Sequence, residues 1–345
     1  MRKVALLIFM VIVAAGTAAA TVYVRTQQSY RGYEGNEQFV DIPSGSSTKA
    51  IGDRLVEASV VRDPLTYRLA LVLSGHARGL KAGEYRFDQA MTPLQVLEKI
   101  ARGDVYSIAV TFPEGLTVAE MAAIAESHRL GTAAAFIAAA TDKALVRTLD
   151  PLAQDLEGYL FPETYRVSRH TDGPALVRLM VNRFDHVFSP ELRRGAEKHG
   201  LSVHQLVVLA SLVEKETARA DERPIVAAVY LNRFRIGMAL QCDPTIIFAL
   251  QRAGTYTGNL RRDDLALDSP YNTYRYPGLP PGPIAAPGKA SLEAVVNPAD
   301  VDYLYFVSRN DGSHEFAATL AQHNRNVQKY QVQYFRDRKA ARSSH

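Results

Sequence analysis

The sequence predicts an α+β protein built from an N-terminal transmembrane helix, a small α+β module and a larger, mainly helical domain with short strands. Three observations carry this prediction. An uncharged apolar run occupies residues 4–24, strand and helix patterns alternate over residues 37–104, and helical periodicity dominates residues 105–335. About 320 residues lie outside the apolar run, which suggests two folded domains.

The apolar run is long enough to cross a bilayer, since roughly 20 helical residues span the hydrocarbon core. Residues 1–3 carry two cations ahead of it, and Arg25 closes it. The alternative is a cleaved signal peptide, because the three alanines at 18–20 form the small-residue pattern that signal peptidases accept.

We favour a retained anchor, because the apolar run continues past those alanines to Val24. The cations of residues 1–3 then keep that end in the cytoplasm, and the remaining chain lies outside the membrane. Residues 25–36 are rich in Gln, Gly and Ser and indicate a polar tether.

Residues 37–104 show the pattern of a strand, two helices, a strand and a further helix. Asp63 followed by Pro64 marks a helix start, and residues 92–95 form a capping box with proline in the first turn. Residues 81–87 alternate as a strand does. This module suits either a glycan-binding unit or a spacer.

In the larger domain, a strand at 106–112 precedes an alanine-rich helix that begins at the capping box of residues 117–120. Helices are expected at 117–140, 176–188, 190–198, 204–218, 221–234, 246–251 and 317–335, and a strand at 303–307. Residues 269–283, rich in Tyr and Pro, form a long loop whose aromatic side chains argue against disorder. Residues 336–345 indicate a basic tail.

The composition excludes several functions. A net charge of +4 with dispersed basic residues argues against nucleic-acid binding, because no clustered basic patch is present. The mild excess of base is compatible with attraction to an anionic wall polymer or lipid surface. The single cysteine, Cys242, excludes an intramolecular disulfide and is expected to be a small packing residue. The nine histidines lack metal-ligand spacing, so no metal is expected, and we expect His204, His314 and His323 to be polar surface residues. No phosphate-binding loop or cofactor motif is present.

The helix predicted at 204–218 carries an acid on its apolar side. At about 100° per residue, the apolar direction passes near Leu209, Val213 and Glu216, whereas Glu214 and Lys215 point away. Burial would raise the pKa of Glu216 and let it hold a proton near neutral pH, as a general acid must. A helix-end glutamate bonded to backbone or arginine is an equally good interpretation of the helix alone.

Residues 156–165 pack two acids among three aromatic residues, with one glycine and one proline as breakers. This composition suits a sugar-binding wall, where rings stack on the apolar face of a pyranose and carboxylates bind its hydroxyls. A buried aromatic corner between helices fits nearly as well.

Five blocks, in order, closely resemble the bacterial endolytic murein transglycosylases of the MltG, or YceG-like, type. They are LEGYLFPETY at 156–165, ASLVEKET at 210–217, LQCDPT at 240–245, YNTY at 271–274 and GLPPGPI at 278–284. The resemblance extends from the membrane segment to about Tyr330. It implies an inner-membrane anchor with a single pass, a LysM-like module at 37–104 and a periplasmic catalytic domain with a lysozyme-like helical site.

The second glutamate of the EKE block is the family's catalytic acid, so the resemblance implies Glu216 in that role. Asp243 and Asn272 match cleft-lining positions of the family. The full set of expected substrate-binding residues is Glu157, Tyr159, Glu163, Gln241, Asp243, Tyr271, Asn272 and Tyr274. Peptidoglycan glycan strands are the implied substrate, and a penicillin-binding glycan synthase is the implied protein partner. No cofactor is implied.

The implied reaction makes the protein a lytic transglycosylase, a carbon–oxygen lyase that acts on a polysaccharide. It cleaves the β-1,4 bond from N-acetylmuramic acid to N-acetylglucosamine and leaves a 1,6-anhydromuramyl end, with Glu216 as acid and then base. One alternative is a hydrolytic muramidase, in which Glu157, Glu163 or Asp243 assists Glu216. Another is an anchored, non-catalytic scaffold that binds glycan and cell-wall synthases.

Overall fold

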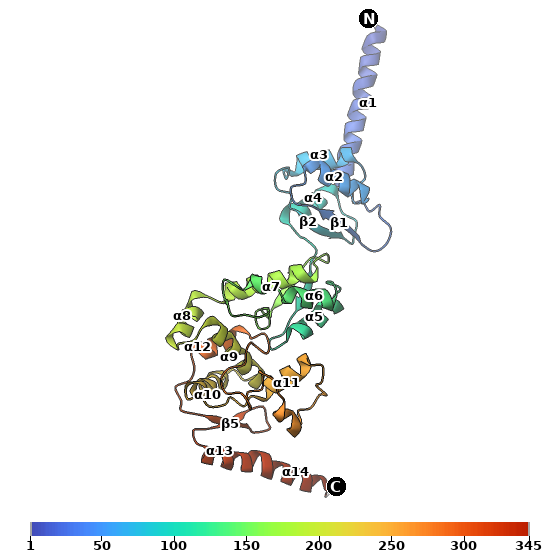
Figure 1. The fold of residues 1–345 in the computed structure, drawn as a ribbon. Coiled ribbons are helices and arrows are strands. Elements are labelled where there is room, and N and C mark those ends of the chain that lie inside the picture. The colour runs from blue at the N-terminus through green and yellow to red at the C-terminus, as the bar shows by residue number, and fades with distance from the viewer. Residues whose placement is uncertain (1, 344–345) are drawn as a thin grey trace. The chain divides into compact units, whose positions relative to one another are not determined.

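The structure, a computed structural model, describes residues 2–343 and confirms a mixed helical and β protein with an apolar N-terminal helix and small two-stranded sheets (Figure 1). Its chain forms two compact units. The first runs to Ile108 and includes Arg166–Ser168, and the second comprises the remaining residues.

Helix α1 spans Arg2–Gln27, and by length and composition it could cross a membrane. It continues beyond the apolar run into the segment predicted as a tether. Arg25 Nη1 lies 3.4 Å from the Asp63 carboxylate, Thr26 is fully buried, and Tyr30 bridges to Met91. The first residues of the expected tether therefore pack against the module that follows, because Asp63 and Met91 supply partners that the local composition does not reveal.

The module has the predicted order of elements: β1 Gln38–Ile42, α2 Thr48–Glu57, α3 Pro64–Ser74, β2 Gly83–Phe87 and α4 Pro93–Arg102. The two strands pair antiparallel, with Val40 opposite Tyr85. Both predicted helix starts are confirmed. The Asp63 carboxylate accepts hydrogen bonds from the first turn of α3, and Thr92 and Gln95 form the capping box of α4.

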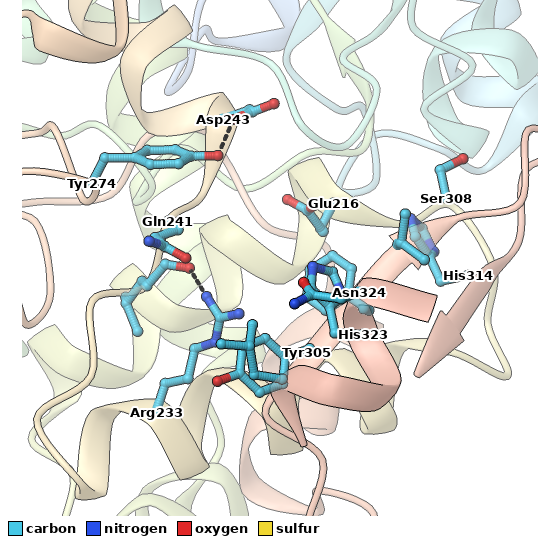
Figure 2. A pocket seen from close by; sticks show the side chains of 14 residues that line it. Glu216, Arg233, Gln241, Asp243, Tyr274, Tyr305, Ser308, His314, His323 and Asn324 are labelled. Carbon is cyan, nitrogen blue, oxygen red and sulfur yellow. Dashed lines mark hydrogen bonds between the residues drawn. The ribbon is translucent and has the colours of Figure 1, made fainter. Parts of the chain in front are cut away.

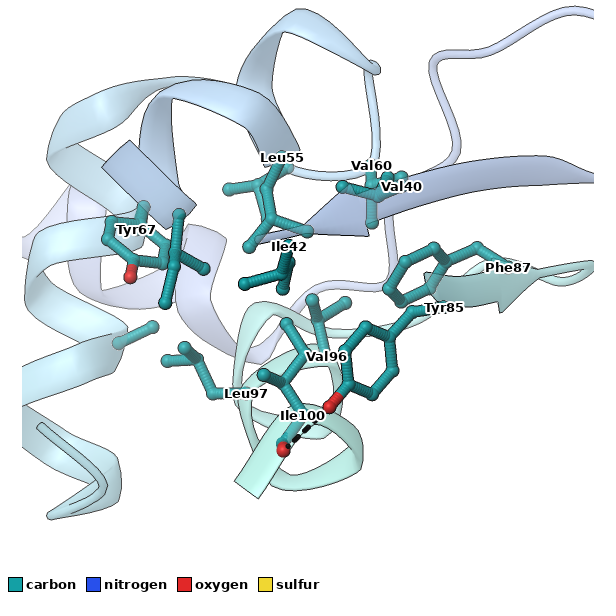
Figure 3. Close-up of a cluster of buried hydrophobic side chains, with 13 residues drawn as sticks. Val40, Ile42, Leu55, Val60, Tyr67, Tyr85, Phe87, Val96, Leu97 and Ile100 are labelled. Atoms are coloured by element: carbon teal, nitrogen blue, oxygen red, sulfur yellow. Dashed lines mark hydrogen bonds between the residues drawn. The ribbon is translucent and has the colours of Figure 1, made fainter. Parts of the chain in front are cut away.

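The core of the module lies between this sheet and its helices (Figure 3). Ile42, Leu55, Tyr85 and Leu97 are almost wholly buried there. The Tyr85 hydroxyl donates to the carbonyl of Ile100 at 3.2 Å, so the one polar atom of this ring is satisfied inside the apolar core. The module therefore has its own hydrophobic core.

The elements of the second part of the chain, in order, are β3 Ile108–Thr111, α5 Val118–Ser127, α6 Ala133–Ala140, β4 Thr164–Val167, α7 Gly173–Val187, α8 Pro190–Lys198, α9 Val203–Glu216, α10 Arg223–Arg235, α11 Asp243–Arg252, α12 Lys289–Val296, β5 Tyr305–Ser308, β6 His314–Ala317, α13 Leu320–Val327, a π-helical turn at Gln328–Gln333, and α14 Tyr334–Ser343. Short 3₁₀ turns lie at Lys143–Leu145 and Arg262–Ala266. Strands β5 and β6 pair antiparallel.

Two helix predictions differ from the structure. The helix expected over 117–140 is broken into α5 and α6, because Arg129 and Gly131 adopt positive φ and Thr132 caps a new helix. The last helix, predicted to end near Phe335, continues to Ser343, so it includes most of the segment predicted as a tail. Residues 344–345 of that tail lie outside the described residues.

Helix α9 is the central element of the larger unit. A capping box of Ser202 and Gln205 starts it, and every residue from Leu206 to Val213 is buried. Ser211, inside this apolar stretch, accepts a hydrogen bond from the N–H of Ile284 at 3.1 Å. The helix thus emerges from the core with its final residue, Glu216, held at a defined position.

Candidate active site

Glu216 lies in an open pocket of about 480 Å³ (Figure 2). The lining residues are Glu216, Arg233, Leu240, Gln241, Asp243, Tyr274, Tyr305, Phe306, Val307, Ser308, His314, Leu320, His323 and Asn324. Of the nine predicted site residues, this set contains Glu216, Gln241, Asp243 and Tyr274. The pocket combines the C-terminal end of α9 with the start of α11, strands β5 and β6, and α13.

The carboxyl group of Glu216 faces the protein interior, as the helix periodicity predicts. It is partly buried, whereas Lys215 beside it is exposed. Burial raises the pKa of Glu216, and this effect exceeds the lowering by a hydrogen bond from Tyr230 and by the nearby imidazole of His314. The carboxyl group can therefore retain a proton at a higher pH than an exposed glutamate does.

The other acid of the same helix turn, Glu214, is more buried than its direction on the helix suggests. The side chain of Glu214 is only 7% exposed and accepts a hydrogen bond from the N–H of Gly288 at 2.9 Å. Arg223 lies 4.0 Å away. Glu214 does point away from the pocket, but the chain around Gly288 covers it, which periodicity within one helix cannot reveal.

Two buried side chains contact the Glu216 carboxylate. The Tyr230 hydroxyl, from α10, donates at 3.1 Å, and the thiol of Cys242 donates at 3.6 Å. Burial raises the pKa of both groups well above their ordinary values, so both remain neutral donors. Cys242 is a packing residue, as expected, but its partner is Glu216. The sequence carries no signal for Tyr230, which lies on a separate helix.

Asp243 is the second carboxylate on the pocket lining. The Tyr274 hydroxyl donates to it at 2.6 Å, and burial together with this bond raises the pKa of Tyr274. Gln241 next to it has a φ of 52°, and its N–H donates to the carbonyl of Thr273 at 3.1 Å. A left-handed conformation is uncommon for glutamine and occurs where the surrounding structure holds it in place.

Two predicted site residues of the YNTY block lie outside the pocket lining. Asn272 is fully buried, and its amide nitrogen donates to the carbonyls of Leu265 and Leu267 at 3.0 and 2.8 Å. Tyr271 packs on Phe248, with ring centroids 5.0 Å apart. Both residues shape the loop that carries Tyr274.

The acidic and aromatic segment at 156–165 is likewise separate from this pocket. Glu157 accepts the N–H of Val118 at 3.1 Å, in the first turn of α5, and burial raises its pKa to about 8. The Tyr159 hydroxyl donates to Asp150, and Glu163 pairs with Arg183 at 3.1 Å. These contacts match the buried aromatic corner that was the alternative interpretation of the segment.

The histidines are more deeply placed than predicted. His204 is 14% exposed; its ring nitrogens lie 2.8 Å from Asp150 and 3.1 Å from the carbonyl of Pro281, and the Asp150 contact raises its pKa. His323 is half-buried and stacks on Tyr305. The expectation of surface positions is wrong because the partners of these rings lie far away in the sequence.

His314 is held by a buried acid. Its ring Nδ1 lies 2.7 Å from Glu222 Oε2, and its backbone N–H donates to Glu222 Oε1 at 2.9 Å. Thr217, the residue after Glu216, donates its hydroxyl to the same Glu222 at 3.2 Å. Glu222 therefore connects the end of α9 to strand β6 and fixes the imidazole on the pocket wall.

Arg233 closes the wall between α10 and β5. Its guanidinium donates to the carbonyls of Leu304 and Leu240, each at 2.6 Å, and the bond to Leu240 is drawn in Figure 2. Among the described residues, no group of three or more His, Cys, Asp or Glu side chains is arranged to hold a metal ion. Glu216 and Asp243 are the carboxyl groups on the pocket lining, and polar side chains surround them.

The fold and the site together define a class of protein. An apolar N-terminal helix and a small α+β module accompany a helical domain in which a partly buried glutamic acid with a raised pKa lines an open pocket. The chain belongs to the YceG-like family, whose model matches residues 40–329. The resemblance in the five sequence blocks is thereby confirmed.

Curated relatives carry a functional name. An endolytic murein transglycosylase of Bacillus subtilis is 33% identical over 310 residues, which is 84% of each chain. A protein of the same name from Streptococcus pneumoniae strain D39 is 31% identical over 318 residues, and the match covers 84% of this chain and 57% of that one. A crystal structure of a YceG-like protein from Listeria monocytogenes superposes with a TM-score of 0.57 at 30% identity, covering 84% of this chain and 98% of that one.

Proposed function

We propose that the protein is an endolytic lytic transglycosylase that cuts the β-1,4 bond from N-acetylmuramic acid to N-acetylglucosamine in peptidoglycan. The observation that supports this most directly is Glu216, a single acid with a raised pKa in an open polar pocket of a chain whose relatives carry that name. The comparisons support the reaction class. The role of Glu216 is our own assignment.

In the proposed reaction, protonated Glu216 donates its proton to the bridging oxygen as the bond from that oxygen to muramic C1 breaks. An oxocarbenium-like centre develops at C1, and N-acetylglucosamine leaves with a free 4-hydroxyl. The 6-hydroxyl of the same muramic residue then attacks C1 and gives its proton to ionised Glu216. The product ends in 1,6-anhydromuramic acid, and the acid is restored.

The contacts of Glu216 suit both halves of this cycle. Burial favours the neutral acid before the bond breaks, while the Tyr230 hydroxyl and the Cys242 thiol donate to the carboxylate once it is ionised. Neither donor carries a charge. The site therefore lowers the cost of the ionised state without holding Glu216 permanently deprotonated.

A hydrolytic muramidase needs a second carboxyl group, with the two about 5–9.5 Å apart. Glu157 and Glu163 have backbone and arginine partners outside this pocket, so Asp243 is the remaining predicted candidate. Asp243 accepts a hydrogen bond from Tyr274 of the 269–283 loop. We propose that this loop excludes water from the bond that is cleaved. The mass of the product ends separates the two reactions, because hydrolysis adds water and leaves a reducing end.

Glu216→Gln tests the proposal. Incubated with isolated murein, the variant should lose about 10²- to 10⁴-fold in activity, because glutamine cannot transfer the proton. Its matched control is Glu191→Gln, on α8 with a side chain 72% exposed and outside this pocket. Mass spectrometry should find anhydromuramyl ends from the wild type and from the control.

Three results would contradict the proposal. Reducing ends alone would favour the muramidase, and undiminished cleavage by the Glu216→Gln variant would remove Glu216 from the catalytic role. No cleavage by the wild type, with an unchanged phenotype of the variant in cells, would favour the non-catalytic scaffold. Circular dichroism of both variants shows whether any loss reflects unfolding.

We further propose that α1 is retained as a single-pass anchor in the bacterial inner membrane, with residues 1–3 in the cytoplasm and the catalytic domain in the periplasm. Its apolar length supports this. The module at 37–104 is proposed to be LysM-like and to hold glycan close to the catalytic cleft, and a penicillin-binding glycan synthase is the proposed partner. Protease added to spheroplasts should digest the catalytic domain and spare an N-terminal tag.

A further inference from the structure

Helix α3 exposes an apolar face. Leu65 is 62% exposed, Val72 77% and Leu73 47%, and the opposite face buries Tyr67 and Ala70 in the module core. Leu65 and Val72 are seven residues apart and so lie on one side of the helix. A helix that is apolar on all sides is normally covered on all sides, but within the module this face is open.

The other two helices of the module do not share this property. Helix α2 exposes Lys49 and Asp53, paired at 2.8 Å, and α4 exposes Glu98 and Arg102, paired at 3.4 Å. Arg68 is the one charged residue within α3, and it is exposed. The apolar face is therefore particular to α3.

The same helix begins where the membrane-spanning run ends. Arg25 follows the last residue of that run and lies 3.4 Å from Asp63, the residue that caps α3. Val22, still inside the run, is half-buried. Figure 1 shows α3 at the end of the module from which α1 emerges. The first turn of α3 is thus level with the end of the apolar run.

We propose that the exposed face of α3 lies in the boundary layer of the bilayer that α1 crosses. Leu65, Val72 and Leu73 enter the outer part of the acyl chains, and Arg68 extends to the phosphate of the lipid headgroups. The occupant is a lipid surface, because the apolar face has a cation and no acid on its own helix and is continuous with a membrane helix. This inference rests on the retention of α1, and it is independent of the proposed catalysis.

The chain has no tryptophan, so a single introduced tryptophan reports one position. We would place it at Val72→Trp and, as control, at Asp41→Trp, an exposed residue of β1. Figure 1 shows strand β1 farther from α1 than α3 is. Full-length protein is reconstituted into vesicles whose lipids carry bromine on the upper acyl chain. The Val72→Trp emission should shift to shorter wavelength and lose at least half its intensity to bromine, whereas Asp41→Trp should do neither.

Equal quenching of the two variants, or none in either, would overturn the proposal. A short-wavelength emission from Val72→Trp without bromine quenching would also overturn it, since protein and not lipid would then cover the face. Leu65→Trp repeats the measurement at the first turn of α3 in case Val72→Trp misfolds. Flotation of the wild type with the vesicles tests the anchor itself, and failure to float would end the inference while leaving the catalytic proposal untouched.

Discussion

Glu216 balances two opposing demands on one side chain. Burial helps the carboxyl group to hold its proton, and the hydrogen bonds from Tyr230 and Cys242 keep the ionised form accessible. The Tyr230 hydroxyl is the stronger of these donors, because a thiol is a weak one. The pH at which activity declines should therefore depend on Tyr230.

We expect Tyr230→Phe to move the alkaline limb of the pH–rate profile upward, on the order of 1 pH unit. The hydrogen bond from Tyr230 lowers the pKa of Glu216, so its loss lets the acid keep its proton to higher pH. The maximal rate should fall, because the ionised carboxylate loses a donor.

Tyr165→Phe is the control for this change, since the Tyr165 hydroxyl is buried but donates to the carbonyl of Phe161, outside the pocket lining. An unmoved or downward-shifted limb in Tyr230→Phe would contradict the assignment of Glu216 as the titrating acid.

Glu222 is a positioning residue for the pocket wall. Glu222→Gln should lower kcat by up to about 10²-fold, because glutamine cannot accept both contacts from His314 and the one from Thr217. Asp221→Asn is the neighbouring control, as the Asp221 side chain is 68% exposed and pairs with Arg219. If thermal stability alone changed while kcat and KM stayed at their wild-type values, Glu222 would have a structural role only.

The direction of Glu216 on its helix could be predicted from the sequence, but only part of its surroundings could. Glu216 could be predicted because helical periodicity fixes its direction from neighbours within two turns. Arg233 and His314 line the pocket from α10 and β6, and Tyr230 contacts Glu216 from α10; no local pattern predicts which distant segment packs there. Glu157 illustrates the reverse case. The composition of its segment, residues 156–165, suited sugar binding, whereas the Glu157 carboxylate contacts the first turn of α5.

Among the elements, those with strong end signals were predicted best. Helix α8 begins and ends at the predicted residues, because Ser189 caps it and Pro190 occupies its first turn. Strands β4 and β6 and helix α12 were missed. Each is short, at four to eight residues, and depends on tertiary partners for its stability.

The start of α5 depends on a carboxyl group from outside the helix. Burial raises the pKa of Glu157 to about 8, whereas an unfolded chain releases that proton at about 4.3. The native state therefore loses stability as the pH rises between these values. We expect Glu157→Gln to leave stability unchanged at about pH 4 and to raise it at about pH 8, measured by urea unfolding.

Glu157→Ala should be less stable than Glu157→Gln by about 1–2 kcal/mol, because alanine leaves the N–H of Val118 without its acceptor. If Glu157→Gln instead lost activity on murein with its stability intact, Glu157 would belong to substrate binding.

At the level of the whole chain, the module and the larger unit each have a core, so they can be separated by deletion. Removal of residues 37–104 should raise KM for long glycan strands, on the order of tenfold, while kcat on short fragments stays near the wild-type value. Full activity on isolated murein together with full function in cells would remove the proposed glycan-holding part of the module.

The junction between α1 and the module has a further consequence. With Arg25 tied to Asp63 and Thr26 buried, the module cannot swivel on its stalk without the stalk turning as well. If α1 is the proposed anchor, a neighbouring protein that binds one side of it within the bilayer would therefore fix the rotation of the module about the axis of α1. With α1 as the proposed anchor, contacts inside the bilayer would then govern the orientation of the module.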